Sequence, residues 1–217
     1  MLGKTKHTKI LLSFIGSNDA GTLLENSTSE GAIITALENE SFDQLILLWN
    51  ENNYSHPTYA KIVKHLRKEI KKIRLVKQVT DNKMDISDVT NHNEIYSSIK
   101  IFVDELSKTE NIKYTASVTS GTPAMQVCWI LLGESGEFSE NYPLRLIQVK
   151  DPRFGKSQNV EVDLDTTLPK IISLKEEVEN LKKDLVPTAT LNIGRGKLSV
   201  GGTEINHYGL QVHSFSY

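Results

Sequence analysis

The stretch that most constrains the fold is residues 112–126, IKYTASVTSGTPAMQ. Its first half is rich in β-branched and small residues, which predicts a buried strand, and an apolar helix follows from Pro123 to about Gly133. In the turn between them, the Thr122 hydroxyl can cap the helix, and Pro123 stands where no backbone N–H is needed. A buried strand that turns directly into a helix is the repeating unit of α/β proteins.

The same turn suits a negatively charged ligand. Gly121 lets the backbone approach a bound group closely, and the N–H groups and dipole of the helix start favour negative charge. A phosphate or a polar base edge would fit there. An ordinary strand-to-helix connection also favours Ser, Gly, Thr and Pro, so the turn alone leaves both interpretations open.

The rest of the chain alternates predicted strands and helices. Strands are expected at residues 9–15, 42–49, 75–79 and 144–149 with an edge strand at 160–164, and helices at 32–37, 58–74 and 95–106. A capping box at residues 27–30 introduces the first helix. This order predicts an α/β fold, a Rossmann-like, mainly parallel sheet with helices on both faces. Residues 167–185 add a C-terminal helix, and residues 191–205 a small β-hairpin.

Composition and charge limit the partners and the compartment. The chain has 217 residues, 38% apolar and 24% charged, enough for one core with a small appendage. Its net charge of −2 gives no overall attraction to nucleic acid or anionic membrane, so such binding would need a local patch. The basic helix 58–74 is either an RNA or partner surface or, more commonly for such a pattern, a charged face exposed to solvent. We therefore expect no membrane partner and no long nucleic acid on this domain. One cysteine, Cys128, and no secretion signal or 18-residue apolar run favour a cytoplasmic protein.

Several enzyme classes lack their sequence signatures. The chain has neither Gly-x-Gly-x-x-Gly after the first strand nor Gly-x-x-x-x-Gly-Lys-Ser/Thr, which argues against dinucleotide oxidoreductases and P-loop NTPases. Its six histidines have no metal-ligand spacing, so no metal or cofactor is expected. A generic Rossmann-like methyl-donor enzyme would need an acidic ribose-binding residue such as Glu51, but no glycine-rich first turn supports that alternative.

Polar loops follow four of the predicted strands, at Gly16, Trp49, Thr119 and Lys150. Because the carboxyl ends of parallel strands share one edge of the sheet, ligands in such folds bind there. The expected ligand-binding residues come from these loops: Gly16, Ser17, Asn18, Asp19, Trp49, Asn50, Thr119, Ser120, Gly121, Thr122, Pro123, Met125, Gln126, Lys150 and Arg153.

Four segments together resemble a CARF domain, the CRISPR-associated Rossmann fold: residues 10–21, 42–49, 117–129 and 143–149, closing on 162–165. Within that superfamily the chain is most similar to the sensor half of the sigma-54-dependent regulator of RNA repair. The resemblance covers about residues 8–165, and the Thr-Ser-Gly-Thr-Pro turn is its most specific part. It divides the chain into a sensor (1–165), a connecting or dimer helix (166–186) and a hairpin tail (187–217), the last being the start of a truncated effector or winged-helix module.

The resemblance implies a function as well as a fold. It implies a homodimer that binds cyclic oligoadenylate, the tetra- or hexa-adenylate second messenger of type III CRISPR immunity, or a related RNA end, and that regulates an attached or partner effector. Residues 16–19 would form the first ligand loop and residues 119–123 with Met125 the second, while Lys150 and Arg153 would supply cations. Among the expected ligand-binding residues, Asp19 does not suit a phosphate, because a carboxylate repels it.

A ring nuclease is the alternative function. Some CARF dimers cleave their own ligand without metal, by holding a ribose 2′-hydroxyl in line with its phosphate. The residues that would do so here are Ser17, Asn18, Thr122 and Lys150.

Overall fold

A computed structural model describes residues 7–23, 31–51, 57–151, 153, 155–164, 189–192, 197–200 and 203–205. The chain divides into two compact units, Met1–Pro169 and Lys170–Tyr217. The expected division at residues 165 and 186 stays a prediction. No helix in the described part of the chain is long and apolar enough to cross a membrane.

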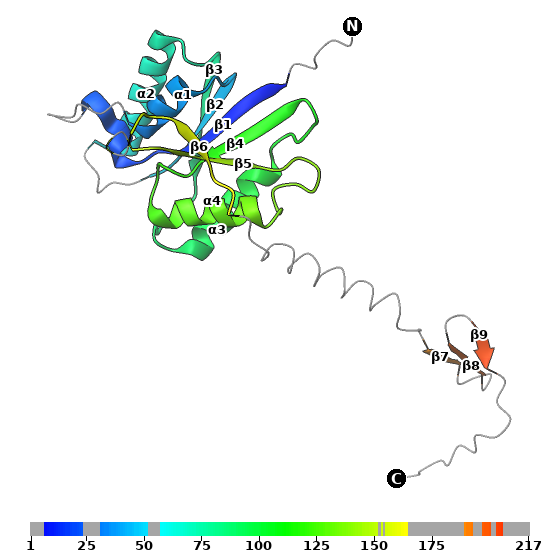
Figure 1. Cartoon of the computed structure of the whole chain (residues 1–217). Coiled ribbons are helices and arrows are strands. Elements are labelled where there is room, and N and C mark those ends of the chain that lie inside the picture. Colours follow the sequence, from blue (N-terminus) through cyan, green and yellow to red (C-terminus); the bar gives the residue numbers. More distant parts are fainter. Residues whose placement is uncertain are drawn as a thin grey trace, which may run out of the picture. The chain divides into compact units, whose positions relative to one another are not determined.

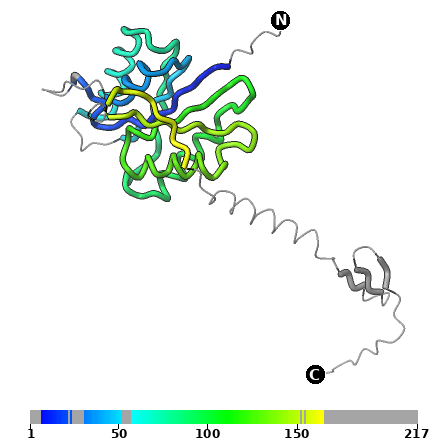
Figure 2. The backbone as a smooth tube through the Cα atoms, viewed as in Figure 1, coloured from blue at the N-terminus to red at the C-terminus, as the bar shows by residue number. Residues whose placement is uncertain are grey.

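The first unit is built on a six-stranded sheet with the order β3-β2-β1-β4-β5-β6 (Figure 1). The strands are β1 (Thr8–Phe14), β2 (Gln44–Asn50), β3 (Gln78–Met84), β4 (Ile112–Ser117), β5 (Arg145–Val149) and β6 (Asn159–Glu161). The first five are parallel, and β6 pairs antiparallel with β5 at the edge. In Figure 2 the dark-blue β1 lies inside the sheet, between backbone of later colour. The expected mainly parallel Rossmann-like sheet is confirmed.

Helices cover both faces of this sheet (Figure 1). They are η1 (Ser17–Leu23), α1 (Ala32–Asn39), α2 (Tyr59–Ile73), α3 (His92–Asp104) and α4 (Pro123–Glu134). One core lies under α1 and α2 and the other under α3 and α4. Successive residues of β1 point to opposite faces, so Leu11 packs in the first core while Leu12 and Phe14 pack in the second. This explains why β1 is an almost unbroken apolar run.

The third strand differs from the prediction. The sequence predicted residues 75–79, whereas β3 spans Gln78–Met84. Helix α2 ends at Ile73, its C-cap residue Arg74 lies in the left-handed region (φ 53), and Leu75 and Val76 pack half-buried as a connector. Because β3 lies at the edge of the sheet, its polar residues can face solvent, which hides the strand from a search for apolar runs.

Other predictions concern parts outside the described residues or the second unit. The capping box at 27–30 and the helix at 167–185 lie outside the described residues. The expected β-hairpin is present in the second unit, where β7 (Ala189–Asn192) pairs antiparallel with β8 (Lys197–Val200), and β9 (Thr203–Ile205) adds a third antiparallel strand.

Candidate functional site

A cavity of about 280 Å³ lies at the carboxyl ends of β1, β4 and β5. The chain passes from β1 to β2 on one side and from β4 to β5 on the other, so strand order reverses between β1 and β4. This is where α/β folds bind ligands. The lining residues come from the carboxyl ends of β1, β4 and β5, including the first residues of η1, and from the start of α1: Gly16, Ser17, Asn18, Asp19, Gly31, Ala32, Thr35, Thr119, Ser120, Gly121, Val149, Lys150 and Asp151.

Two glycines allow the loops after β1 and β4 to meet at this cavity. A Cβ atom on Gly16 would lie 3.1 Å from the backbone N of Gly121. Gly121 itself has φ +90, and its Cβ would lie 2.9 Å from Phe14 Cβ and 3.1 Å from Met125 Sδ. A side chain is therefore both strained and crowded at Gly121, which makes glycine a requirement of the turn.

Hydrogen bonds from β5 and from α4 hold the loop between Thr119 and Thr122 in place. Thr119 Oγ1 accepts a hydrogen bond from the backbone N–H of Val149 at 2.7 Å, which ties the β4 loop to β5. Gln126 Nε2 donates to the carbonyl oxygen of Thr119 at 3.3 Å and to that of Gly121 at 3.5 Å. Gln126 thus supports the loop from α4 without lining the cavity.

Asp19 is buried within the site and stabilises its backbone. Its side chain is 1% exposed, and its carboxylate accepts hydrogen bonds from the backbone N–H of Gly16 at 2.9 Å and of Ile33 at 3.2 Å. Gly31 precedes α1 without a side-chain cap, so Asp19 supplies the acceptor that this helix start needs. Burial raises the pKa of Asp19, and the hydrogen bonds from Gly16, Ile33 and Ser120 oppose that rise. The expected conflict between Asp19 and ligand phosphates is reduced, because its oxygens are already engaged.

The pKa of Asp19 predicts a pH effect on stability. Because the folded protein holds this proton more tightly than the unfolded chain does, the contribution of Asp19 to stability is fully present below pH 3.8 and is lost as pH rises through the folded pKa. Wild type should therefore lose stability relative to Asp19→Asn as pH increases. Urea unfolding of both proteins across acidic and neutral pH measures this difference in the free energy of unfolding. The contributions of the other carboxylates are the same in both proteins and cancel. A relative gain by wild type with rising pH would contradict the assignment.

Lys150 is the cation among the lining residues. It follows β5, and a Cβ on Gly155 would lie 3.2 Å from its Nζ, so the absence of a side chain there leaves room for the ammonium group. Asp151 also lines the cavity, but its charge is balanced by Arg153, whose Nη2 lies 2.6 Å from Asp151 Oδ2. This pairing lowers the pKa of Asp151. Arg153, the second cation expected in the site, is not among the lining residues. It forms an ion pair with Asp151 instead.

The structure brings together eight of the expected site residues: Gly16, Ser17, Asn18, Asp19, Thr119, Ser120, Gly121 and Lys150. Their role as ligand contacts stays a prediction. Trp49, Asn50, Pro123 and Met125 do not line the cavity. Trp49 Nε1 donates to Asp81 Oδ2 at 3.1 Å, which turns it toward β3, and Asn50 is 3% exposed at the end of β2.

Thr122 also lies outside the lining residues. Its hydroxyl donates to the carbonyl oxygen of Val89 at 2.9 Å and accepts from the backbone N–H of Met125 at 3.3 Å. The expected cap is present, but the hydroxyl is not directed at a ligand.

Thr122→Val should consequently lower the free energy of unfolding by about 1–2 kcal/mol through loss of the helix cap. Thr122→Ser, which keeps the hydroxyl, should stay close to wild type in the same urea titration. A larger loss in Thr122→Ser than in Thr122→Val would show that the methyl group, and not the cap, stabilises the turn.

Five lining residues were not predicted: Gly31, Ala32, Thr35, Val149 and Asp151. The first three belong to the start of α1, which follows β1 and returns to the same edge of the sheet. Helices that follow parallel strands begin at the carboxyl edge of the sheet, as the loops do. If the helix starts had been included with the loops, these residues would have been predicted.

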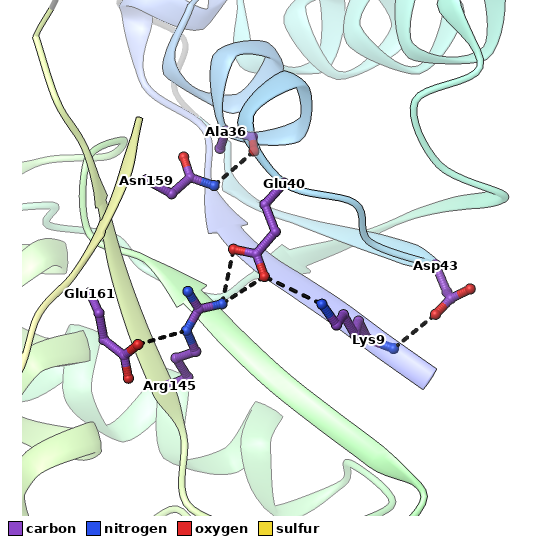
Figure 3. A network of polar contacts seen from close by, with 7 residues as sticks. All are labelled: Lys9, Ala36, Glu40, Asp43, Arg145, Asn159 and Glu161. Atoms are coloured by element: carbon purple, nitrogen blue, oxygen red, sulfur yellow. Dashed lines mark hydrogen bonds and ion pairs between the residues drawn. The ribbon is translucent and has the colours of Figure 1, made fainter. Parts of the chain in front are cut away.

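A larger cavity, of about 520 Å³, lies at the opposite end of the sheet, near the starts of β1, β4 and β5. Figure 3 shows the charged groups beside it, in which Arg145 Nη1 contacts both Glu40 oxygens at 2.8 and 2.9 Å and Arg145 Nε contacts Glu161 at 3.2 Å. Lys9 Nζ lies 3.6 Å from Glu40. These charges balance one another and tie α1 to β5 and β6, so we assign this network to the fold.

No group of three or more His, Cys, Asp and Glu side chains in the described ranges is placed to hold a metal ion. The available chemistry is that of hydroxyls, one amide, backbone N–H groups and Lys150. Such a set suits an anionic, hydroxyl-rich ligand.

Comparisons with known proteins agree with this geometry. The family model for the regulator of RNA terminal phosphate cyclase, RtcR, matches residues 9–185. Among solved structures, Enterococcus italicus Csm6 bound to cyclic hexa-2′-fluoro-hexa-dAMP matches with a TM-score of 0.60 and 18% identity. That match covers 82% of this chain and 48% of the Csm6 chain, so the chain spans about half of that protein. No curated protein matches the sequence. The chain belongs to the RtcR family of regulators of RNA terminal phosphate cyclase, and its α/β unit is a CARF domain.

Proposed function

We propose that this chain is a sensor that binds cyclic oligoadenylate at the cavity between β1, β4 and β5. The observation that carries the proposal is the convergence of residues 16–19, residues 119–121 and Lys150 on one cavity at the switch point of the sheet. Hydroxyls and backbone N–H groups can bind phosphodiester oxygens, and Asn18 can bind an adenine edge. The fold matches about half of the Csm6 chain, which was solved with a cyclic hexanucleotide analogue.

The size of the cavity supports a homodimer. At about 280 Å³ it is just below the range of roughly 300–1,000 Å³ for drug-sized ligands, so it can enclose only part of an oligonucleotide ring. Two copies related by a twofold axis would supply two such cavities to one ring. The ligand would then have twofold symmetry, as cyclic tetra- and hexa-adenylate do.

Helix α4 offers the surface on which a second copy would pack. It begins beside the cavity at Thr122, and its outward side exposes Val127 by 42% and Leu131 by 52%. These two residues are four apart and therefore lie on the same side of the helix. Paired α4 helices would bury this apolar side and bring the two cavities close together.

Leu131→Glu should convert the dimer into a monomer, because it places a charge in the proposed apolar contact. Light scattering at micromolar concentration would give the mass of one chain instead of two. Ile73→Glu, at a similarly exposed residue of α2 on the other face of the sheet, should leave the dimer intact. A wild-type mass of one chain, or dissociation by both substitutions, would contradict the α4 interface.

The proposal also includes control of an effector. The second unit, Lys170–Tyr217, follows directly after the sensor and contains a small three-stranded sheet. A ligand that changes how the two sensor units of the dimer pack would also change the distance between the two segments that follow them in sequence. This change could be passed on to an effector.

Ring cleavage is the second candidate function. Ser17, Asn18 and Lys150 line the same cavity, so neutral groups could hold a ribose 2′-hydroxyl while a cation stabilises the developing charge. Thr122, the fourth expected residue, is engaged as a helix cap and is no longer part of this set.

Calorimetric titration with cyclic tri-, tetra- and hexa-adenylate tests the function, with linear tetra-adenylate as the control. We expect one even-numbered ring to bind with a stoichiometry of one ring per two chains. Chromatography of the nucleotides after incubation then separates a sensor, which returns the ring intact, from a ring nuclease, which yields linear products. No heat with any ring would contradict both functions.

A further inference from the structure

Helix α2 carries a row of lysines on its outward side. Lys61, Lys64, Lys68 and Lys71 are all exposed, and their spacing of three, four and three residues places them on one side of the helix. At 1.5 Å per residue, successive members are about 4.5–6 Å apart along the helix axis. We refer to these four residues as the α2 lysine row.

The opposite side of α2 is fixed in the core. Ile62, Val63, Leu66 and Ile70 are all buried in the cluster formed with β1 and β2. The helix therefore cannot turn an apolar side toward a lipid bilayer, and the lysine row is held in a constant orientation on the α/β unit.

The acidic groups near α2 are paired with other cations. Asp81 contacts Arg67, Glu69 lies 3.7 Å from Lys72, and Asp43 contacts Lys77 at 2.5 Å. In the part of the chain that the structure describes, no member of the lysine row forms an ion pair with an acidic side chain. Four uncompensated positive charges thus stand in line on a chain whose net charge is −2.

From this arrangement we infer that the α2 lysine row binds the phosphodiester backbone of a nucleic-acid strand. A linear series of cations matches a polymer with one negative charge per nucleotide. An acidic protein is a poorer match, because protein interfaces need an apolar centre and this row contains no apolar side chain. The row has no aromatic residue for base stacking, so the binding is independent of sequence. The inference replaces our expectation of no nucleic-acid partner, which rested on the net charge of the whole chain.

Fluorescence anisotropy of the full chain with a labelled 20-nucleotide oligo(U) RNA tests the inference. This RNA contains no adenine, which separates the experiment from the cavity and from the proposed function. Four phosphate contacts predict a slope of about −3 for log K against log salt concentration, or about a fiftyfold loss of affinity between 50 and 200 mM salt.

Matched double variants locate the contact. Lys64→Gln/Lys68→Gln should halve the slope and weaken binding at 50 mM salt at least about tenfold. Lys113→Gln/Lys156→Gln, which removes the same charge from two exposed lysines elsewhere, should change affinity less than about twofold. Circular dichroism would confirm that all variants are folded. No binding at 50 mM salt, equal losses in both double variants, or equal affinity for poly-glutamate would each overturn the inference.

Discussion

Gly121→Ala is expected to lower the free energy of unfolding by about 2–5 kcal/mol and to abolish ligand binding. The left-handed φ of +90 strains any side chain, and the new Cβ would lie 2.9 Å from Phe14 Cβ inside the core. Either the strand β1 or the turn before α4 must move, and both form the cavity. Urea unfolding measures the first effect and calorimetry the second.

Gly136→Ala is the matched control for this substitution. Gly136 also has a positive φ, of +73, but nothing lies within 4 Å of its Cβ position. It should therefore show only the cost of backbone strain, about 1–3 kcal/mol, and keep full affinity for the ligand. If the two variants lost the same stability, crowding against Phe14 and Met125 would not be the reason for glycine at position 121.

Lys150→Ala should weaken the binding of cyclic oligoadenylate by about 10- to 150-fold for each lysine that contacts the ring. Lys150 is the cation among the residues that line the cavity, and Asp151 is already balanced by Arg153. The loss corresponds to a hydrogen bond between charged groups, and two copies would contribute twice to one ring.

The control for Lys150→Ala is Lys156→Ala, an exposed lysine six residues later that does not line the cavity. Both variants change the net charge of the protein by the same amount. The affinity of Lys156→Ala for the ring therefore reports the effect of net charge alone. We expect a change smaller than about twofold at physiological salt. Equal losses in both variants would mean that Lys150 acts only through the net charge of the protein.

Local patterns in the sequence predicted those elements whose formation depends on neighbouring residues. Helix α2 was expected at residues 58–74 and spans Tyr59–Ile73, because its apolar residues repeat at helical spacing. Helix α4 begins at Pro123 with Thr122 as its cap, as the turn chemistry indicated. Strand β3 was misplaced because an edge strand needs few apolar residues, so its polar sequence resembles a loop.

The orientation of side chains in the site could not be read from the sequence. Asp19 and Ser17 belong to the same polar segment of the sequence, which folds as η1, yet Asp19 points inward to cap α1. Trp49 lies near the carboxyl end of β2, at the same edge of the sheet, but its hydrogen bond to Asp81 turns it away from the cavity. Thr35 lines the cavity because α1 packs beside η1 and β5, a contact between elements that no local pattern contains.

Hydrogen–deuterium exchange with and without the bound ring tests the location of the site most directly. We predict slower exchange in peptides that contain residues 16–19, 31–35, 119–122 and 149–151, with no change at the opposite end of the sheet. Protection of residues 110–115 and 141–145, which border the larger cavity beside Arg145, would instead place the ligand there and contradict the account.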